Sequence, residues 1–178
     1  MICAILMVMA PSRTDLKNRK SIRFPEYDYS QPGAYFVTIL TYQRQPFFGN
    51  LVNGLMELSP LGRLAASVWL GLPNRFAGVE IDEFIVMTDH FHGILLLNQG
   101  IIQTYDSLSL TTPTRRSLGT IVGTFKSTVS KVYHFNNPGN NEPIWHRNYF
   151  ERIIRDEHEL NGIREYILTN PVRSEVEE

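Results

Sequence analysis

The chain has 178 residues, a formal net charge of −1 and 43% hydrophobic residues. This length and composition fit one globular domain and exclude a wholly disordered chain. The single cysteine, Cys3, excludes an intramolecular disulfide and a zinc site built from thiolates.

Charge is distributed unevenly along the sequence. Residues 1–33 have a net charge of +2, residues 34–114 of −3, residues 115–155 of +5 and residues 156–178 of −5. Attraction to phosphate groups depends on the local field and not on the total charge. The near-zero total charge by itself argues against a nucleic-acid binder. It conceals, however, a basic block at residues 115–155 that could bind phosphate groups. The alternative is that these charges simply form a solvated surface.

The first ten residues, MICAILMVMA, are apolar but too few to span a bilayer, which takes about 20 residues. Basic residues follow this run instead of preceding it, unlike those of a signal peptide. We therefore expect a flexible leader over residues 1–18, one domain over residues 19–173 and a short acidic tail over residues 174–178. We also expect a cytoplasmic location and no membrane partner.

Residue patterns predict alternating strands and helices in chain order. Strands rich in β-branched, aromatic and other apolar residues are expected at 34–43, 79–88, 90–98 and 145–154. A helix should open at Ser59-Pro60, a second should span 116–134, and a third should follow an Asp156 capping box and end at Pro171. The strands joined at Thr88-Asp89 must be antiparallel, which predicts an α+β fold with the sheet on one side and helices on the other.

Two histidines, His90 and His92, lie two residues apart in a predicted strand. Because side chains alternate along a strand, both imidazoles should point to one face and Phe91 to the other. The pair begins an apolar strand, and a rigid strand of this kind can hold the ligands of a metal site in fixed positions. A surface pair or a hydrogen-bonded pair is the alternative.

A second pair, Tyr166 and Asn170, lies four residues apart in the last predicted helix. Residues at this spacing share a helix face, and both lie beside the apolar stripe of Leu160, Ile163 and Ile167. The alternative is a half-buried tyrosine and a helix-ending asparagine before Pro171.

Taken together, these motifs resemble a known family. The run Asp89-His90-Phe91-His92-Gly93-Ile94 is similar to the His-hydrophobic-His motif of the HUH single-strand DNA nucleases. Residues 145–155 and 164–172 resemble the C-terminal signature of REP-associated tyrosine transposases. Residues 19–23, 27–41 and 123–127 fit the same family, so the resemblance covers roughly residues 19–173.

The resemblance implies a ferredoxin-like α+β sandwich, with a central antiparallel sheet and helices packed on it. It implies a transposase or endonuclease that cleaves and rejoins single-stranded or hairpin DNA, such as REP elements, through a 5′-phosphotyrosine intermediate. Tyr166 matches the catalytic tyrosine, and His90, His92 and Asn170 match the ligands of a divalent metal ion, Mg²⁺ or Mn²⁺. Whether the protein is a monomer or a homodimer, and whether Tyr166 serves its own chain or a partner, stays open.

Basic and small residues provide candidate DNA contacts. The candidate phosphate-binding residues are Arg19, Lys20, Arg23, Lys126, Arg147, Arg152 and Arg155. Gly119, Gly123, Lys126 and Ser130 share a helix stripe that would let a DNA backbone approach, although close packing on the sheet is an equal alternative. Trp145 or Tyr149 could stack on a base, with a place in the core as the alternative.

Two other functions remain compatible with the sequence. One is a structure-specific DNA-binding protein without catalysis, which the basic block and the acidic end at Ser174–Glu178 would suit. The other is a metal hydrolase that cleaves DNA with water.

Overall fold

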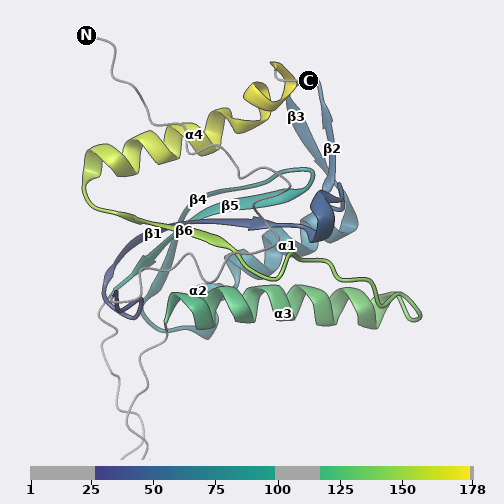
Figure 1. Cartoon of the computed structure of the whole chain (residues 1–178), viewed down its shortest axis with the longest axis horizontal. Coiled ribbons are helices and arrows are strands. Elements are labelled where there is room, and N and C mark those ends of the chain that lie inside the picture. The colour runs from purple at the N-terminus through teal and green to yellow at the C-terminus, as the bar shows by residue number, and fades with distance from the viewer. Residues whose placement is uncertain (1–26, 99–116, 177–178) are drawn as a thin grey trace, which may run out of the picture.

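A computed structural model describes residues 27–98 and 117–176. The strands are β1 (Gly33–Leu40), β2 (Gly49–Val52), β3 (Leu55–Leu58), β4 (Val79–Val86), β5 (His90–Leu97) and β6 (Phe150–Ile154). The helices are α1 (Pro60–Leu70), α2 (Leu72–Arg75), α3 (Leu118–Asn136) and α4 (Glu157–Val176), with a 3₁₀ turn at Tyr42–Arg44. The predicted leader (residues 1–18), residues 19–26, residues 99–116 and residues 177–178 lie outside the described residues (Figure 1).

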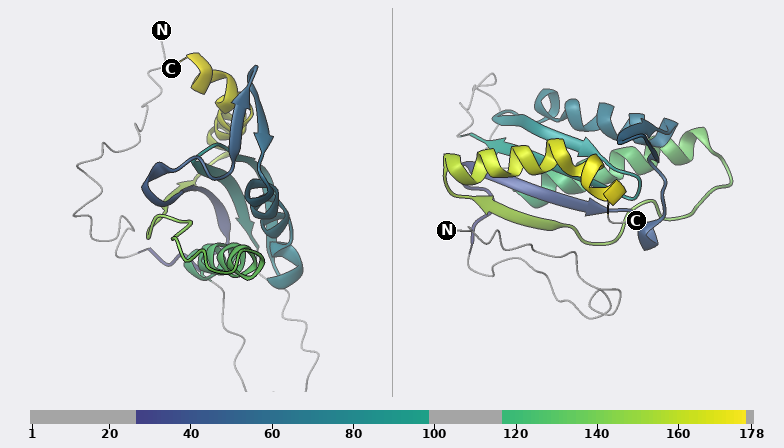
Figure 2. Two further views of the ribbon diagram at one scale, coloured as in Figure 1. Left: turned by 90° about the vertical axis from the view of Figure 1, so that its right-hand side faces the viewer. Right: turned by 90° about the horizontal axis from the view of Figure 1, so that it is seen from above.

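The four long strands form one antiparallel sheet in the order β4-β5-β1-β6. With α1 between β1 and β4, and α3 between β5 and β6, this is the βαββαβ arrangement of a ferredoxin-like fold. Helices α1 and α3 cover one face of the sheet and α4 lies across the other (Figures 1 and 2). The α+β sandwich is confirmed, but the expectation that all helices lie on one side is wrong.

Strand alternation accounts for the two faces. On the α1/α3 side the buried strand residues Tyr35, Val37 and Ile39 of β1 alternate with residues of the opposite face. On the α4 side a separate cluster of buried residues consists of Ile94, Ile154, Ile163 and Ile167. The large core therefore lies on the side away from α4, and α4 needs only a narrow apolar strip to dock.

The predicted helix starts are confirmed by their caps. The Ser59 hydroxyl accepts a hydrogen bond from the backbone nitrogen of Gly62 at 3.0 Å, and Pro60 is the first helical residue. Ser117 caps α3 in the same way. At α4 the Asp156 carboxylate accepts from the Glu159 nitrogen at 2.8 Å, and the Glu159 side chain accepts from the Arg155 nitrogen at 2.9 Å.

Two sequence-based boundaries are wrong, and one pair of strands is missing from the predicted elements. The predicted strand at 145–154 becomes β6 only from Phe150, because Trp145 makes an isolated bridge with Thr41. Helix α4 continues through Pro171, which is buried together with Asn170, so tertiary burial overrides the local cost of proline. The β2–β3 hairpin is absent from the predicted elements, although its turn residues, Asn53 and Gly54, have the positive φ angles that an Asn-Gly turn favours.

A small residue at Gly93 lets helix α1 approach the sheet. A Cβ atom at Gly93 would lie 2.6 Å from Cζ2 of Trp69 and 2.9 Å from Cε1 of Phe91. Both rings are fully buried, so neither has free space to move into. Close packing of α1 on β5 therefore depends on the absence of a side chain at this position.

We expect Gly93→Ala to lower the free energy of unfolding by about 1–3 kcal/mol, because the added methyl group overpacks the core. Gly123→Ala is the matched control, since a Cβ atom at Gly123 meets nothing within 4 Å. That variant should raise the free energy of unfolding by up to about 1 kcal/mol through helix propensity. Urea unfolding of both variants measures the difference; a neutral Gly93→Ala would contradict the packing argument.

Candidate active site

The histidine pair lies on strand β5 and faces helix α4. The ring centroids of His90 and His92 are 4.7 Å apart, and only 5% of the His92 surface is exposed. Phe91 points to the opposite face and packs on Trp69 in the main core, with ring centroids 4.7 Å apart. The predicted sharing of one face by the two histidines is therefore confirmed.

Each histidine is oriented through its Nδ1 atom. Thr38 is opposite His92 in the β1–β5 register, and its hydroxyl lies 2.8 Å from His92 Nδ1. The Asp89 carboxylate lies 2.6 Å from His90 Nδ1 and can accept a hydrogen bond from it. Oxygen partners of this kind fix ring orientation and tautomer in histidines that bind metals. The sequence patterns did not predict that Thr38 and Asp89 orient the two histidines; they included Asp89 only as the first residue of the histidine motif.

The electrostatics of the site favour neutral imidazole on His92. Burial, followed by the nearby charges of His90 and Arg44, holds the pKa of His92 well below its usual value. Burial raises the pKa of Asp89, but its hydrogen bond with His90 and the charges of His90 and Arg44 outweigh this, so the net shift is downward. Neutral imidazole on His92 is the form that can bind a metal cation, and the lowered pKa of Asp89 keeps the carboxylate that orients His90 ionised.

Tyr166 reaches the histidine pair of its own chain. Its hydroxyl lies 3.4 Å from His92 Nε2, and the two ring centroids are 5.3 Å apart. Phe36 of β1 stacks on His92 and meets Tyr166 edge-on, with centroid distances of 5.3 and 6.2 Å. Phe36 thus forms one apolar wall of the site. The structure brings Tyr166 and the histidine pair, which the sequence proposed as one site, together within a single chain.

Asn170 lies one helical turn beyond Tyr166 and is 6% exposed. No group of three or more His, Cys, Asp or Glu side chains among residues 27–98 and 117–176 could hold a metal ion. The predicted ligand set instead combines two imidazoles with an amide oxygen. Such nitrogen and oxygen donors suit a divalent first-row cation, so the residues fit the proposed metal.

Helix α4 is fixed to the edge of the sheet by an ion pair. Arg164 donates from Nε to Asp82 Oδ1 at 2.8 Å and from Nη2 to Asp82 Oδ2 at 2.6 Å. Asp82 lies where the β4–β5 register shifts between Ile81 and Phe84. This two-point contact, together with the buried Ile163 and Ile167, sets the rotation of α4 and so the direction of Tyr166.

The predicted DNA contacts have different surroundings. Arg19, Lys20 and Arg23 lie outside the described residues. Lys126 donates from Nζ to the carbonyl oxygens of His146 and Arg147 at 2.7 and 3.1 Å, and burial lowers its pKa to about 8. Arg152 pairs with Glu159 at 2.5 Å, and Arg147 and Arg155 are exposed.

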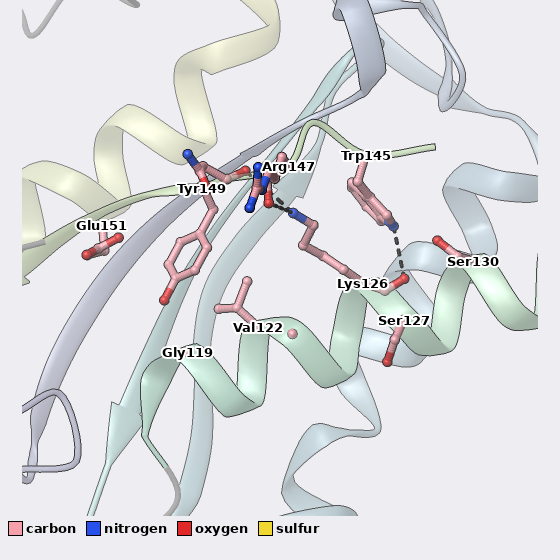
Figure 3. A pocket seen from close by; sticks show the side chains of 11 residues that line it. Gly119, Val122, Lys126, Ser127, Ser130, Trp145, Arg147, Tyr149 and Glu151 are labelled. Atoms are coloured by element: carbon pink, nitrogen blue, oxygen red, sulfur yellow. Dashed lines mark hydrogen bonds between the residues drawn. The ribbon is translucent and has the colours of Figure 1, made fainter. Parts of the chain in front are cut away.

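A groove of about 570 Å³ lies between α3 and the segment that leads into β6 (Figure 3). Its lining includes Gly119, Gly123, Ser130, Arg147 and Tyr149. Gly123 has nothing within 4 Å of its would-be Cβ, so close packing does not explain the glycine there. The predicted stripe of small residues is therefore the floor of an open groove at this position.

Trp145 is a core residue. It is 8% exposed, packs against Phe48 and Phe125, and donates from Nε1 to the carbonyl oxygen of Lys126 at 3.1 Å. The structure thus favours the alternative for Trp145, a place in the core, although its edge also lines the groove. Tyr149 lies in the same lining and remains a candidate for stacking on a base. Among the described residues, no helix is both long and apolar enough to cross a membrane.

Comparison with solved structures identifies proteins that have the same fold. A REP-associated tyrosine transposase bound to a REP hairpin matches with a TM-score of 0.58 and 16% identity, over 85% of this chain and 73% of that one. A candidate transposase from Deinococcus radiodurans matches with a TM-score of 0.48 and 16% identity, over 82% and 94% of the two chains. At such identities the first match shows a shared fold, and no family model matches the chain.

The sequence comparison reaches further than the structural one. An uncharacterized protein of Haemophilus influenzae is 34% identical over 164 residues, which is 88% of this chain and 90% of that protein. Identity at this level over nearly the whole of both chains shows common descent and not only a common fold. The chain therefore belongs to the same protein family as this Haemophilus influenzae protein.

Proposed function

We propose that the chain is a metal-dependent enzyme that cleaves and rejoins single-stranded DNA, with Tyr166 as nucleophile. The observation that carries this proposal is the Tyr166 hydroxyl, 3.4 Å from Nε2 of a buried histidine whose partner on the same face is 4.7 Å away. A nucleophile next to a pair of oriented imidazoles that could hold a metal ion suits attack on a phosphodiester.

In the proposed reaction, the Tyr166 oxygen bonds to phosphorus as the bond from phosphorus to the 3′ oxygen breaks. The phenol loses its proton and the 3′ oxygen gains one, so the products are a 5′-phosphotyrosine and a free 3′-hydroxyl. One ester replaces another, and the step can therefore run backwards to rejoin DNA without an external energy source. A divalent cation held by His90, His92 and Asn170 would neutralise charge on the phosphate oxygens.

The rigid surroundings of Tyr166 support its proposed role. Phenol is a weak nucleophile at its ordinary pKa of about 10, so positioning must contribute much of the rate. The Arg164–Asp82 pair fixes α4, and the Phe36 ring limits the space that Tyr166 can explore. Because both contacts come from the same chain, we propose an active site completed in cis.

We propose hairpin DNA with single-stranded arms as the substrate, because the solved transposase of the same fold is bound to a REP hairpin. The groove supports a path for one arm. Its wall residues Tyr149 and Glu151 flank Phe150, which is opposite Thr38 in the β1–β6 register. Thr38 in turn contacts His92 on the opposite, α4 face of the sheet. An arm in the groove would therefore pass around the edge strand β6 to reach Tyr166.

Wild-type protein incubated with Mn²⁺ and a hairpin oligonucleotide with single-stranded arms should form a covalent adduct that survives denaturing electrophoresis. Tyr166→Phe should abolish the adduct, since it removes only the attacking oxygen. Tyr133→Phe on α3 is the matched control and should leave the yield unchanged. An adduct with Tyr166→Phe would exclude this nucleophile; cleavage without any adduct would favour a water-dependent hydrolase, and binding without cleavage a non-catalytic DNA-binding protein.

Direct titration of the protein with Mn²⁺ by calorimetry tests the ligands. We expect His92→Ala and Asn170→Ala to weaken binding by about 10-fold or more, whereas Asn170→Asp keeps an oxygen donor and should retain it. His158→Ala, at an exposed position of α4, is the control. Equal affinity of the wild type and Asn170→Ala would remove Asn170 from the ligand set.

A size series at Gly123 tests the groove. Gly123→Leu should lower the affinity for a hairpin with single-stranded arms by about 10-fold, because the side chain fills the groove floor, while Gly123→Ala should change the affinity by less than about twofold. Fluorescence anisotropy at fixed salt gives the affinities, and circular dichroism verifies that both variants are folded. If Gly123→Leu binds as the wild type does, the arm does not follow this groove.

A further inference from the structure

Arg44 lies at the end of an unusual turn beside the histidine pair. Gln43 and Arg44 both have left-handed backbone conformations, with φ angles of 52° and 59°. Neither is glycine, so each conformation is strained and persists only where surrounding contacts hold it. Such strain is concentrated at functional sites more often than elsewhere.

Buried contacts hold this turn against the active-site strand. Thr41, which is 1% exposed, places its hydroxyl 2.8 Å from the carbonyl oxygens of both Gln45 and Asp89, and its nitrogen donates to the Asp89 carbonyl at 2.9 Å. The next nitrogen, of Tyr42, donates to the Ile144 carbonyl at 2.8 Å. The backbone that carries Arg44 is therefore fixed relative to Asp89.

The Asp89 carboxylate bridges Arg44 and His90. Its Oδ2 atom lies 2.7 Å from Arg44 Nε, and its Oδ1 atom lies 2.6 Å from His90 Nδ1. The Asp89 and His90 side chains are 17% and 14% exposed, whereas that of Arg44 is 45% exposed. The guanidinium group is thus held at its Nε atom while a large part of the side chain remains open to solvent.

The N–H groups on the terminal nitrogens of Arg44 are available to bind a ligand. A guanidinium has five N–H groups, of which Nε supplies one. Within the described parts of the chain, the contact from Nε to Asp89 is the one ion pair of Arg44, and Nη1 and Nη2 form no hydrogen bond with a protein acceptor. The paired amino groups match the spacing of two oxygens on a phosphate, and their charge also offsets that of Asp89 near an incoming anion.

We propose that Arg44 is a phosphate-binding residue of the active site, which contacts a DNA phosphate at or next to the cleaved bond through its terminal nitrogens. This inference rests on the proposed function. Asp89 then has two tasks: it orients His90 through one oxygen and aims Arg44 through the other. A lysine at this position would retain the charge but could not bind Asp89 and a phosphate with separate edges of one planar group.

The test uses hairpin oligonucleotides in which a single phosphate of the arm is replaced by an uncharged methylphosphonate. Binding is measured in the Tyr166→Phe background, so that no cleavage interferes. On unmodified DNA, adding Arg44→Gln should weaken binding by about 10-fold or more, and Arg44→Lys should restore part of the loss. On the oligonucleotide that lacks the contacted charge, the Tyr166→Phe protein should bind equally well with and without the Arg44→Gln substitution.

Arg75→Gln, which also removes one exposed positive charge, is the control and should reduce the affinity of all these oligonucleotides by the same small factor. The inference is overturned if Arg44→Gln binds unmodified DNA as well as its parent does. It is also overturned if its penalty is the same at every methylphosphonate position, since that would mean a general field or an effect through His90. Failure of the wild type to form an adduct tests the proposed function separately, because these affinities are measured without cleavage.

Discussion

The pairing register of β1 with β5 is the constraint on which the rest of the structure depends. Thr38 is opposite His92 and Val37 is opposite Gly93 in this register. Side chains alternate along a strand, so one register places Gly93 under Trp69 and at the same time brings the Thr38 hydroxyl to His92. A slip of one residue would send the histidines into the apolar core and Phe91 to the site, and burial of unpaired imidazoles would oppose it.

Helix α4 is the second element of the site and depends on a different kind of contact. The buried part of its interface consists of Ile163 and Ile167 against Ile94 and Ile154. Apolar contacts are not directional, so this strip alone would allow α4 to rotate or slide. The Arg164–Asp82 pair adds two directed hydrogen bonds at the edge of the sheet. Together they define where the Tyr166 hydroxyl lies relative to His92.

Ion pairs change the interpretation of the charge pattern. The +5 block predicts a path for DNA, yet Lys126 donates to backbone carbonyls and Arg152 pairs with Glu159 of the acidic C-terminal segment. In the other direction, Arg44 comes from a segment with net negative charge and has its terminal nitrogens beside the site. Neighbourhood in space, and not in sequence, decides which cations can attract a phosphate.

Local sequence determined the elements and the candidate residues of this protein. Ser59-Pro60 and Asp156 mark helix starts because capping involves residues only a few positions apart, and His-Phe-His alternation assigns two faces within a single strand. The tyrosine and asparagine of α4 could be placed on one face for the same reason, since their spacing is a property of the helix itself.

Only the tertiary structure decided how these pieces act together. That Tyr166 meets His92 in its own chain, that α4 continues through Pro171, and that Thr38, Asp89 and Arg44 surround the histidines all depend on contacts between segments distant in sequence. A periodic pattern carries no information on such contacts, because it records which face a residue occupies and not what packs against that face. The physical reason is that strand register, burial and ion pairing between distant segments depend on one another and form together as the sheet and helices pack.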